Sequence, residues 1–338
     1  MSETVRGTNG QPLVSVRGVS KTFVLGKSIV RRVLGKQPEY LQAVRDVHLD
    51  IDHGEALGLV GESGCGKTTL GRCILRLYEP DEGQVLFRGE DFLALEGQAL
   101  RQMRRKMQVI FQDPYSSLNP RQKVNQMLGE ACSVHSVCPP NEVKDRVAYL
   151  LSIVGLGSDV ADRYPHELSG GQRQRVGLAR ALAVEPEFVV ADEPVSALDV
   201  SIQAQVVNLL MELQERLDLT MLFITHDLRL VHYVSHRVAV MYLGRIVELG
   251  SSGSLFREPL HPYSQALLAA LPKIDPRSRS RAAAIQGEPP SPINIPPGCA
   301  FHPRCPVAID RCRVEMPDLL DVGGRRSVAC FVAQAGAF

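Results

Sequence analysis

The sequence predicts an α/β fold in which helices accompany a mixed β-sheet. Three short segments are apolar almost throughout and alternate with longer helical patterns: Ala56–Val60, Phe188–Ala191 and Met221–Ile224. Such runs suit strands that are buried on both faces of a parallel sheet. Strand signals become rare between about residues 93 and 164, so we expect a helical subdomain inserted into this core.

Further segments predict an antiparallel β subdomain. Partial alternation of apolar and polar residues marks three segments near the start of the chain: Leu13–Val16, Leu41–Val44 and Val47–Ile51. A hairpin is predicted where Arg237–Tyr242 and Arg245–Leu249 flank the pair Leu243–Gly244, because two strand-like runs separated by two such residues are typical of a tight turn.

Length, charge and hydropathy limit the class of protein. The 338 residues carry a formal net charge of +1, so no global field indicates nucleic acid as a partner. No apolar run approaches the roughly 18–20 residues that a membrane-spanning helix needs. Residues 1–12 are polar and lack the apolar stretch of a signal peptide. We expect them to form a disordered tail, and we expect a cytosolic protein whose membrane association comes through a partner.

A glycine-rich segment predicts a phosphate-binding loop: Gly61-Glu62-Ser63-Gly64-Cys65-Gly66-Lys67-Thr68-Thr69. It follows the first apolar run and opens a helical pattern, which is the context that a Walker A motif requires. Glycines let backbone amides converge on phosphate oxygens, and the helix N-terminus adds a favourable dipole. We expect Lys67 to reach the β- and γ-phosphates of ATP and Thr68 to give its hydroxyl to Mg²⁺. A space-filling role is expected for Cys65.

A second motif ends the buried run Phe188–Ala191, which leads directly into the carboxylates Asp192 and Glu193. Most adjacent acidic pairs are surface charges, but this pair terminates a predicted buried strand downstream of a phosphate-binding loop. The arrangement predicts a Walker B motif, in which Asp192 holds the Mg²⁺ shell and Glu193 polarises the attacking water as general base.

A third segment, Leu168-Ser169-Gly170-Gly171-Gln172, opens another helical pattern. It resembles the signature motif of the nucleotide-binding domains of ABC ATPases. Ser169 and the amides of Gly170 and Gly171 would form a second anion cradle at a helix N-terminus. The resemblance implies a head-to-tail dimer in which each signature motif, Gln172 included, caps the ATP held by the other subunit.

The remaining motifs of this family follow in the expected order. Gln112 is similar to the Q-loop glutamine, which senses the γ-phosphate and Mg²⁺ region and links to the permease. Asp199, in Ser196-Ala197-Leu198-Asp199, is similar to the D-loop, and His226 to the switch histidine that orients the γ-phosphate and water. Phe23 is similar to the aromatic residue that stacks on adenine, with a buried core phenylalanine as the alternative. The resemblance implies a P-loop NTPase fold of the ABC type over residues 13–258.

Two longer stretches resemble the ATPases of oligopeptide, dipeptide and nickel importers. One runs from Gln112 to Arg121; the other begins at His261-Pro262-Tyr263 and continues through segments 287–292 and 298–305. The long insertion before Leu41 is similar to the F-type ATPase of Dpp/Opp systems. The resemblance implies ATP hydrolysis that energises peptide import. The alternatives are import of nickel or another small solute, or a redox- or metal-sensing regulatory protein.

The same resemblance implies partners and a location. They are a second, homologous ATPase in a heterodimer, two transmembrane permease subunits, and an extracytoplasmic substrate-binding protein. The surface around Gln112 and Ser116–Arg121 would contact a permease, which would hold the chain peripherally at the cytoplasmic face of the membrane.

Residues 259–338 form a predicted C-terminal extension with four clustered cysteines: Cys299, Cys305, Cys312 and Cys330. Their spacings of five, six and seventeen residues match no common zinc or ferredoxin pattern. A short proline-rich segment buries little apolar surface, so a bound metal could supply folding energy. Resemblance to the peptide importers implies a [4Fe–4S] cluster. Zn²⁺ and unliganded or disulfide-forming cysteines are the alternatives.

Overall fold

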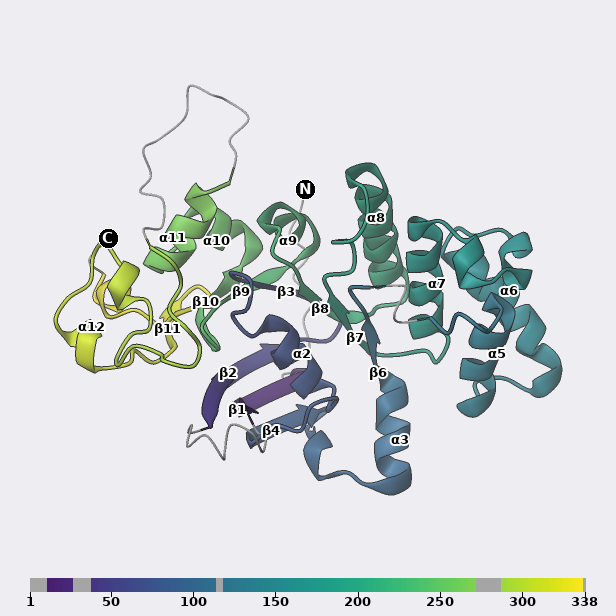
Figure 1. The fold of residues 1–338 in the computed structure, drawn as a ribbon, viewed down its shortest axis with the longest axis horizontal. Helices are drawn as coiled ribbons and strands as arrows, with labels where there is room; N and C mark the ends of the chain where they lie inside the picture. The colour runs from purple at the N-terminus through teal and green to yellow at the C-terminus, as the bar shows by residue number, and fades with distance from the viewer. Residues whose placement is uncertain (1–10, 27–37, 114–117, 272–286, 337–338) are drawn as a thin grey trace. The chain divides into compact units, whose positions relative to one another are not determined.

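The computed structural model describes residues 11–26, 38–113, 118–271 and 287–336 (Figure 1). Most of the predicted tail, the middle of the insertion before Leu41, and part of the 116–121 surface therefore lie outside the described residues. The chain divides into two compact units. The first comprises Met1–Ser15, Asp50–Ala56 and Leu86–Thr225, and the second comprises Val16–Leu49, Leu57–Val85 and His226–Phe338.

The first unit is built on three adjacent parallel strands: β6 (Met107–Ile110), β7 (Phe188–Asp192) and β8 (Thr220–Ile224). β7 lies in the middle, paired with β6 on one side and with β8 on the other. Every residue of β7 and β8 is buried, which confirms the prediction made from their uninterrupted apolar runs. One short strand, β6, lies within the stretch from about 93 to 164 where strand signals are rare, because four residues carry too little pattern to mark a strand.

The described helices of this unit are α3 (Gly97–Lys106), α5 (Val124–Val134), α6 (Val143–Ile153), α7 (Gly170–Leu182) and α8 (Val200–Arg216). Short 3₁₀ turns connect them: η1 (Phe92–Ala94), η2 (Pro140–Glu142), η3 (Ser158–Asp162) and η4 (Pro165–Glu167). Apolar residues of α5 recur at helical spacing, with Val124, Met127, Leu128 and Cys132 buried. α5, α6 and α7 pack on one another. α5 and α6 lie within the range of about 93–164 predicted for the helical subdomain, and α7 follows that range.

The second unit contains a mixed sheet. β3 (Ala56–Val60) runs parallel to β9 (Arg237–Tyr242), and β9 forms an antiparallel hairpin with β10 (Arg245–Ser251). Leu243 and Gly244 connect the hairpin with φ values of 41° and 84°. Two successive positive φ angles are what a type I′ turn requires, so the predicted hairpin is confirmed.

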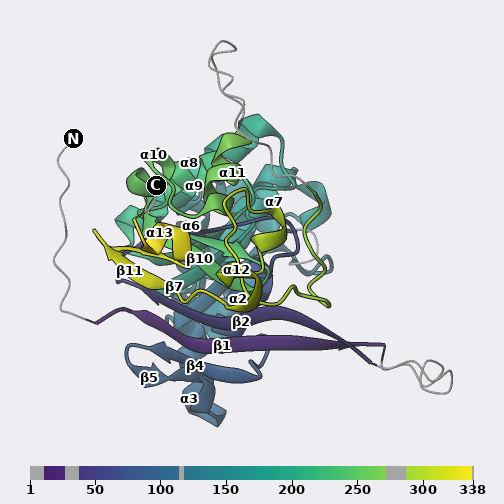
Figure 2. The ribbon, with the colours of Figure 1, turned by 90° about the vertical axis from the view of Figure 1, so that its left-hand side faces the viewer.

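An antiparallel layer accompanies this sheet, in which β1 (Val14–Leu25) lies between β2 (Glu39–Ile51) and β4 (Glu82–Phe87). Figure 2 shows these strands side by side. β4 passes into the first unit and pairs there with β5 (Glu90–Asp91). The two strands predicted between Leu41 and Ile51 are one continuous strand. Asp46, with φ 47°, breaks the side-chain alternation without ending the strand, which explains the error.

The helices of the second unit are α2 (Lys67–Ile74), α9 (Leu228–Val234), α10 (Ser252–Arg257), α11 (Pro262–Ala269), α12 (Arg311–Val314) and α13 (Phe331–Gln334), with the turn η6 (His302–Arg304). The extension adds strands β11 (Leu320–Gly323) and β12 (Arg326–Val328) to the sheet, since β12 pairs with β10. Within the described ranges, none of the helices combines the length and apolar character needed to cross a membrane.

Candidate functional site

The phosphate-binding loop lies in the second unit, between β3 and α2. A Cβ atom on Gly61 would approach the carbonyl oxygen of Met241 to 2.2 Å, and one on Gly66 would approach that of Ala43 to 2.0 Å. Both neighbours are backbone atoms, so no side chain could move aside. The loop is therefore packed closely against β2 and β9, while Ser63 and Gly64 at its tip remain exposed.

The lysine of this loop is almost fully buried. The ammonium group of Lys67 donates to the carbonyl oxygens of Gly61 at 2.9 Å and Glu62 at 3.0 Å. Burial raises the pKa of the neighbouring Cys65 thiol, which keeps it protonated and fits the expected space-filling role. Thr68 and the residue after it lie half-buried in the first turn of α2.

Phe23 near the end of β1 is half-buried, unlike a core residue. Its ring meets Tyr78 edge to face with centroids 5.4 Å apart, and the Lys21 ammonium lies 5.7 Å from its centroid. A partly open aromatic surface of this kind could stack on a base. His226 is exposed and precedes Asp227, which caps α9.

In the first unit the structure brings together two predicted catalytic residues. The amide nitrogen Nε2 of Gln112 donates to Oε2 of Glu193 at 2.9 Å. Gln112 follows β6 and Glu193 follows β7, so their side chains meet at the carboxyl ends of adjacent parallel strands, where ligands of such sheets bind. Glu193 adopts φ 47° and donates its amide to the carbonyl oxygen of Ile224. Asp192, the last residue of β7, is buried.

The predicted signature segment begins α7. Ser169 is the N-cap: its Oγ accepts from the amide of Gln172 at 3.2 Å, and Oε1 of Gln172 accepts from the amide of Ser169 at 3.0 Å. This reciprocal pair is a capping box, so the side chain of Gln172 orients the cradle from within. A Cβ on Gly171 would lie 2.7 Å from Cγ2 of Ile202, which shows how tightly α7 and α8 pack here.

The predicted D-loop leads into α8. Asp199 is the N-cap residue of this helix, and its side chain is exposed. The next residue, Val200, has 81% of its surface exposed. Ser169 and Asp199 are therefore both exposed, and the exposed large apolar side chain of Val200 follows Asp199.

The four cysteines of the extension line one small cavity, together with His261 and His302. Burial raises the pKa of the Cys299 thiol to about 11 and also raises the pKa values of Cys305 and Cys330. Among the described side chains, no group of three or more His, Cys, Asp or Glu is arranged to hold a metal ion. The structure thus supports the clustering of the thiols, but it does not support the predicted metal-binding character of the extension.

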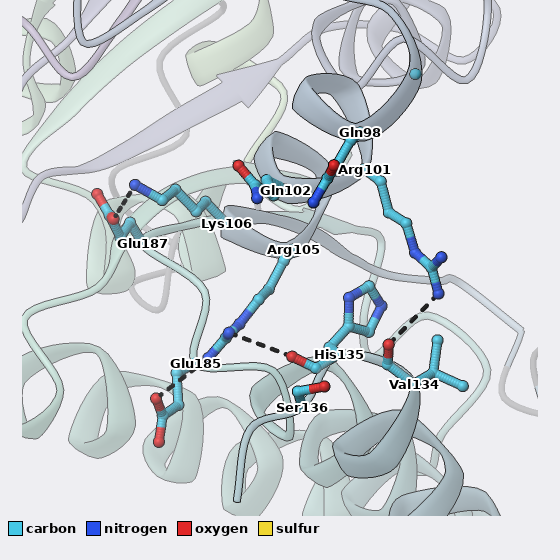
Figure 3. A pocket seen from close by; sticks show the side chains of 11 residues that line it. Gln98, Arg101, Gln102, Arg105, Lys106, Val134, His135, Ser136, Glu185 and Glu187 are labelled. Carbon is cyan, nitrogen blue, oxygen red and sulfur yellow. Dashed lines mark hydrogen bonds and ion pairs between the residues drawn. The ribbon is translucent and has the colours of Figure 1, made fainter.

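A wide cleft of about 940 Å³ opens elsewhere in the first unit (Figure 3). It is lined by Arg101, Arg105 and Lys106 of α3, and by the acidic pair Glu185 and Glu187. Lys106 pairs with Glu187 at 3.3 Å, and Arg105 with Glu185 at 3.7 Å. These residues lie at the amino-terminal ends of β6 and β7, opposite the glutamine–carboxylate pair. The residues that line the cleft include neither Gln112 nor Glu193.

Comparison with known proteins agrees with this arrangement. Residues 44–196 match the ABC transporter family, and residues 247–312 match the C-terminal region of oligopeptide/dipeptide transporters. The oligopeptide transport ATP-binding protein AppF of Bacillus subtilis is 47% identical, over 95% of this chain and 98% of its own. The probable peptide ABC transporter ATP-binding protein y4tS of Sinorhizobium fredii is 51% identical, over 88% and 84%.

A solved structure supports the same fold. A dimeric ATP-binding cassette in a post-hydrolysis state, bound to ADP and Pi, is similar with a TM-score of 0.61 and 28% identity, over 71% of this chain and 98% of its own. The chain therefore belongs to the ABC transporter family, as an ATP-binding subunit with the ABC ATPase fold and its mixed sheet. The match over 247–312 extends the relationship to the C-terminal extension.

Proposed function

We propose that this chain hydrolyses ATP to energise the import of dipeptides or oligopeptides across the cytoplasmic membrane, as one of two ATPase subunits. The observation that carries the proposal is the extent of the similarity. The similarity covers both the ATPase motifs and the C-terminal region. The sequence identity to proteins named for peptide transport is 47% and 51%.

In this proposal the nucleotide contacts are those predicted from the sequence. Phe23 stacks on adenine, and the loop residues from Gly61 to Thr69, with Lys67, bind the phosphates. The oxygens of Thr68, Gln112 and Asp192 suit Mg²⁺, which prefers hard oxygen ligands. Bound Mg²⁺ would neutralise charge that develops on the phosphates.

Two side chains complete the proposed chemistry. Glu193 accepts a proton from the attacking water, and its hydrogen bond to Gln112 at 2.9 Å fixes the carboxylate in place. His226 orients the γ-phosphate and the water, and its exposure leaves the imidazole accessible to a nucleotide.

A second, homologous ATPase forms the proposed dimer with this chain. Ser169, Gly170, Gly171 and Gln172 then face the ATP of the partner, and Asp199 contacts the same interface. The exposure of Ser169, Asp199 and Val200 supports this assembly, because all three side chains are accessible to a partner and a large apolar one would be buried in the contact. The partner in this proposal differs in sequence from the chain, so the dimer is a heterodimer.

The proposed transporter also contains two permeases and an extracytoplasmic substrate-binding protein. The chain would sit peripherally at the cytoplasmic face, and the surface around Gln112 and Ser116–Arg121 would contact a permease. Residues 114–117 of that surface lie outside the described residues, so this contact rests on the family resemblance.

The extension holds a [4Fe–4S] cluster in this proposal, with Zn²⁺ as the alternative occupant of Cys299, Cys305, Cys312 and Cys330. Support comes from the single cavity that all four thiols line. A bound cluster would cross-link the extension and keep the four sulfurs as thiolates. Anaerobic purification tests the proposal: iron and sulfide with visible absorbance support the cluster, zinc alone supports the alternative, and neither metal excludes both.

Reconstitution tests the transport function. The chain would be assembled in proteoliposomes with candidate permeases and a substrate-binding protein from the same organism, with Glu193→Gln as the inactive control. Peptide-stimulated ATP hydrolysis with peptide uptake is the expected result. Stimulation by a nickel chelate alone would instead establish the nickel importer. Failure to assemble with any permease would favour the regulatory alternative.

A further inference from the structure

The phosphate-binding loop of this protein is held by its C-terminal extension. Glu62, the second residue of the loop, forms a two-pronged ion pair with Arg304. Nη1 of Arg304 lies 3.0 Å from Oε2 of Glu62, and Nη2 lies 3.1 Å from Oε1. The Arg304 side chain is 6% exposed and that of Glu62 is 24% exposed. Such a paired contact fixes the direction of a carboxylate as well as its charge.

A second group from the same extension holds the backbone of the loop. The amide of Glu62 donates to the hydroxyl of Tyr263 at 2.9 Å. The carbonyl oxygen of Glu62 accepts from the ammonium of Lys67 at 3.0 Å. All three polar groups of Glu62 therefore have a partner. Arg304 and Tyr263 of the extension bind its carboxylate and its amide, and Lys67 of the loop binds its carbonyl oxygen.

Both holding residues are fixed by aromatic packing. Tyr263 and Phe301 are almost completely buried, and their ring centroids lie 5.4 Å apart. Tyr242 of β9 contacts both rings, at 4.6 Å and 5.3 Å. The hydroxyl of Tyr242 also accepts from Arg304 at 3.3 Å. The guanidinium is thus anchored by a rigid cluster before it meets the loop.

We propose that Arg304 is a positioning residue for ATP binding, which acts through Glu62. A carboxylate in a phosphate-binding loop repels the negative charge of the triphosphate. Arg304 neutralises that charge and directs the carboxylate toward the extension. The ion pair with Arg304 also holds the backbone of Glu62, whose carbonyl oxygen accepts from the Lys67 ammonium. The extension therefore takes part in nucleotide binding.

Equilibrium binding of the fluorescent analogue mant-ATP with Mg²⁺ to the full-length chain tests the proposal, which rests on the ATP binding of the proposed function. Arg304→Met should weaken binding about tenfold, since hydrogen bonds to charged groups are among the stronger ones. Arg304→Lys should restore part of the affinity, because it keeps the charge but loses the two-pronged geometry. Arg313→Met removes an exposed arginine of the same extension and should leave the affinity unchanged.

A double-mutant comparison shows whether Arg304 acts through Glu62. With Glu62→Gln as the reference, adding Arg304→Met should change the mant-ATP affinity by less than about twofold, because the charge to be neutralised is gone. A full tenfold further loss would overturn the proposal, and so would wild-type affinity in Arg304→Met. A purely structural role predicts a lower melting temperature for Arg304→Met with unchanged affinity of the folded fraction.

A second variant of Arg304 and an assay without permease or peptide complete the test. If Arg304→Met does not fold, Arg304→Lys replaces it in the test. Binding of mant-ATP that is about threefold weaker in the wild-type background, and not weakened in the Glu62→Gln background, supports the proposal. Unchanged binding in the wild-type background overturns it. The assay contains no permease or peptide, so a failure of peptide transport leaves its outcome intact. A wild-type chain that binds no mant-ATP would instead contradict the proposed function.

Discussion

Gln112 holds Glu193 by a hydrogen bond of 2.9 Å between Nε2 of the amide and Oε2 of the carboxylate. The two residues follow the carboxyl ends of adjacent parallel strands, β6 and β7. Glu193 is further constrained by its positive φ and by the bond from its amide to Ile224. The backbone and the side chain of the proposed general base are therefore both fixed within the first unit.

Replacement of that base should separate binding from hydrolysis. Glu193→Gln keeps the size of the side chain but cannot accept a proton, so ATP turnover of the assembled transporter should fall by about 10²–10⁴-fold. Binding of mant-ATP should persist, because the phosphate-binding loop is untouched. Steady-state hydrolysis and equilibrium binding on the same preparation measure the two effects. Near wild-type turnover would show that another group is the base.

The signature serine should serve the partner's nucleotide as well as its own helix. Ser169→Ala removes an N-cap that accepts at 3.2 Å and should lower stability by about 1 kcal/mol. In the proposed dimer it should also reduce ATP hydrolysis, because the proposal assigns the hydroxyl to the cradle for the partner's γ-phosphate. Urea unfolding and ATPase assays give the two readouts.

Ser251→Ala is the matched control for this variant. Ser251 caps α10 and likewise accepts from the amide three residues on, Ser254, at 3.2 Å. Loss of this cap should lower stability by a similar amount, about 1 kcal/mol. The ATP hydrolysis rate of the folded protein should not change. Equal hydrolysis in the two alanine variants would remove the proposed role of Ser169 at the dimer interface.

The parts of the fold that the sequence predicts well are those with a strong local pattern. β3, β7 and β8 are uninterrupted apolar runs, and the hairpin at Leu243–Gly244 has a turn that demands positive φ. β6 is only four residues long and follows the basic end of α3, so its pattern is lost in the neighbouring helix.

Contacts between distant segments account for what sequence reasoning missed in the site. The hydrogen bond of Gln112 to Glu193 follows from the pairing of β6 with β7. That pairing could not be predicted, because β6 is not recognisable as a strand in the sequence. Arg304 and Glu62 are 242 residues apart, and no local pattern in the sequence indicates that they pair. The pair meets beside the packed rings of Tyr242, Tyr263 and Phe301, where the Tyr242 hydroxyl also accepts from Arg304.

A buried ion pair anchors the start of the extension. Glu248 of β10 is completely buried; its carboxylate accepts from the amides of Leu260 and His261, both at 2.9 Å, and lies 3.3 Å from Arg326. Glu248→Ala leaves a cation and two amides without this partner, so it should lower stability by about 3–5 kcal/mol. Glu315→Ala, which removes an exposed carboxylate, should cost less than about 1 kcal/mol. Similar urea midpoints for the two variants would contradict the anchor.

Stability should also depend on pH through His261. Burial lowers the pKa of this imidazole to about 3, whereas an unfolded histidine titrates near 6.5. Between these values the unfolded chain binds a proton that the folded chain does not, so stability falls as pH drops below about 6.5. From pH 7 to pH 5 the free energy of unfolding falls by about 2 kcal/mol through this group.

His261→Asn keeps an acceptor for the amide of Tyr263 but cannot titrate, and it should lose this part of the pH dependence. Urea unfolding at pH 5, 6 and 7 measures it, with the exposed His166→Asn as control. An unchanged pH dependence in His261→Asn would show that the imidazole is not held neutral in the folded protein.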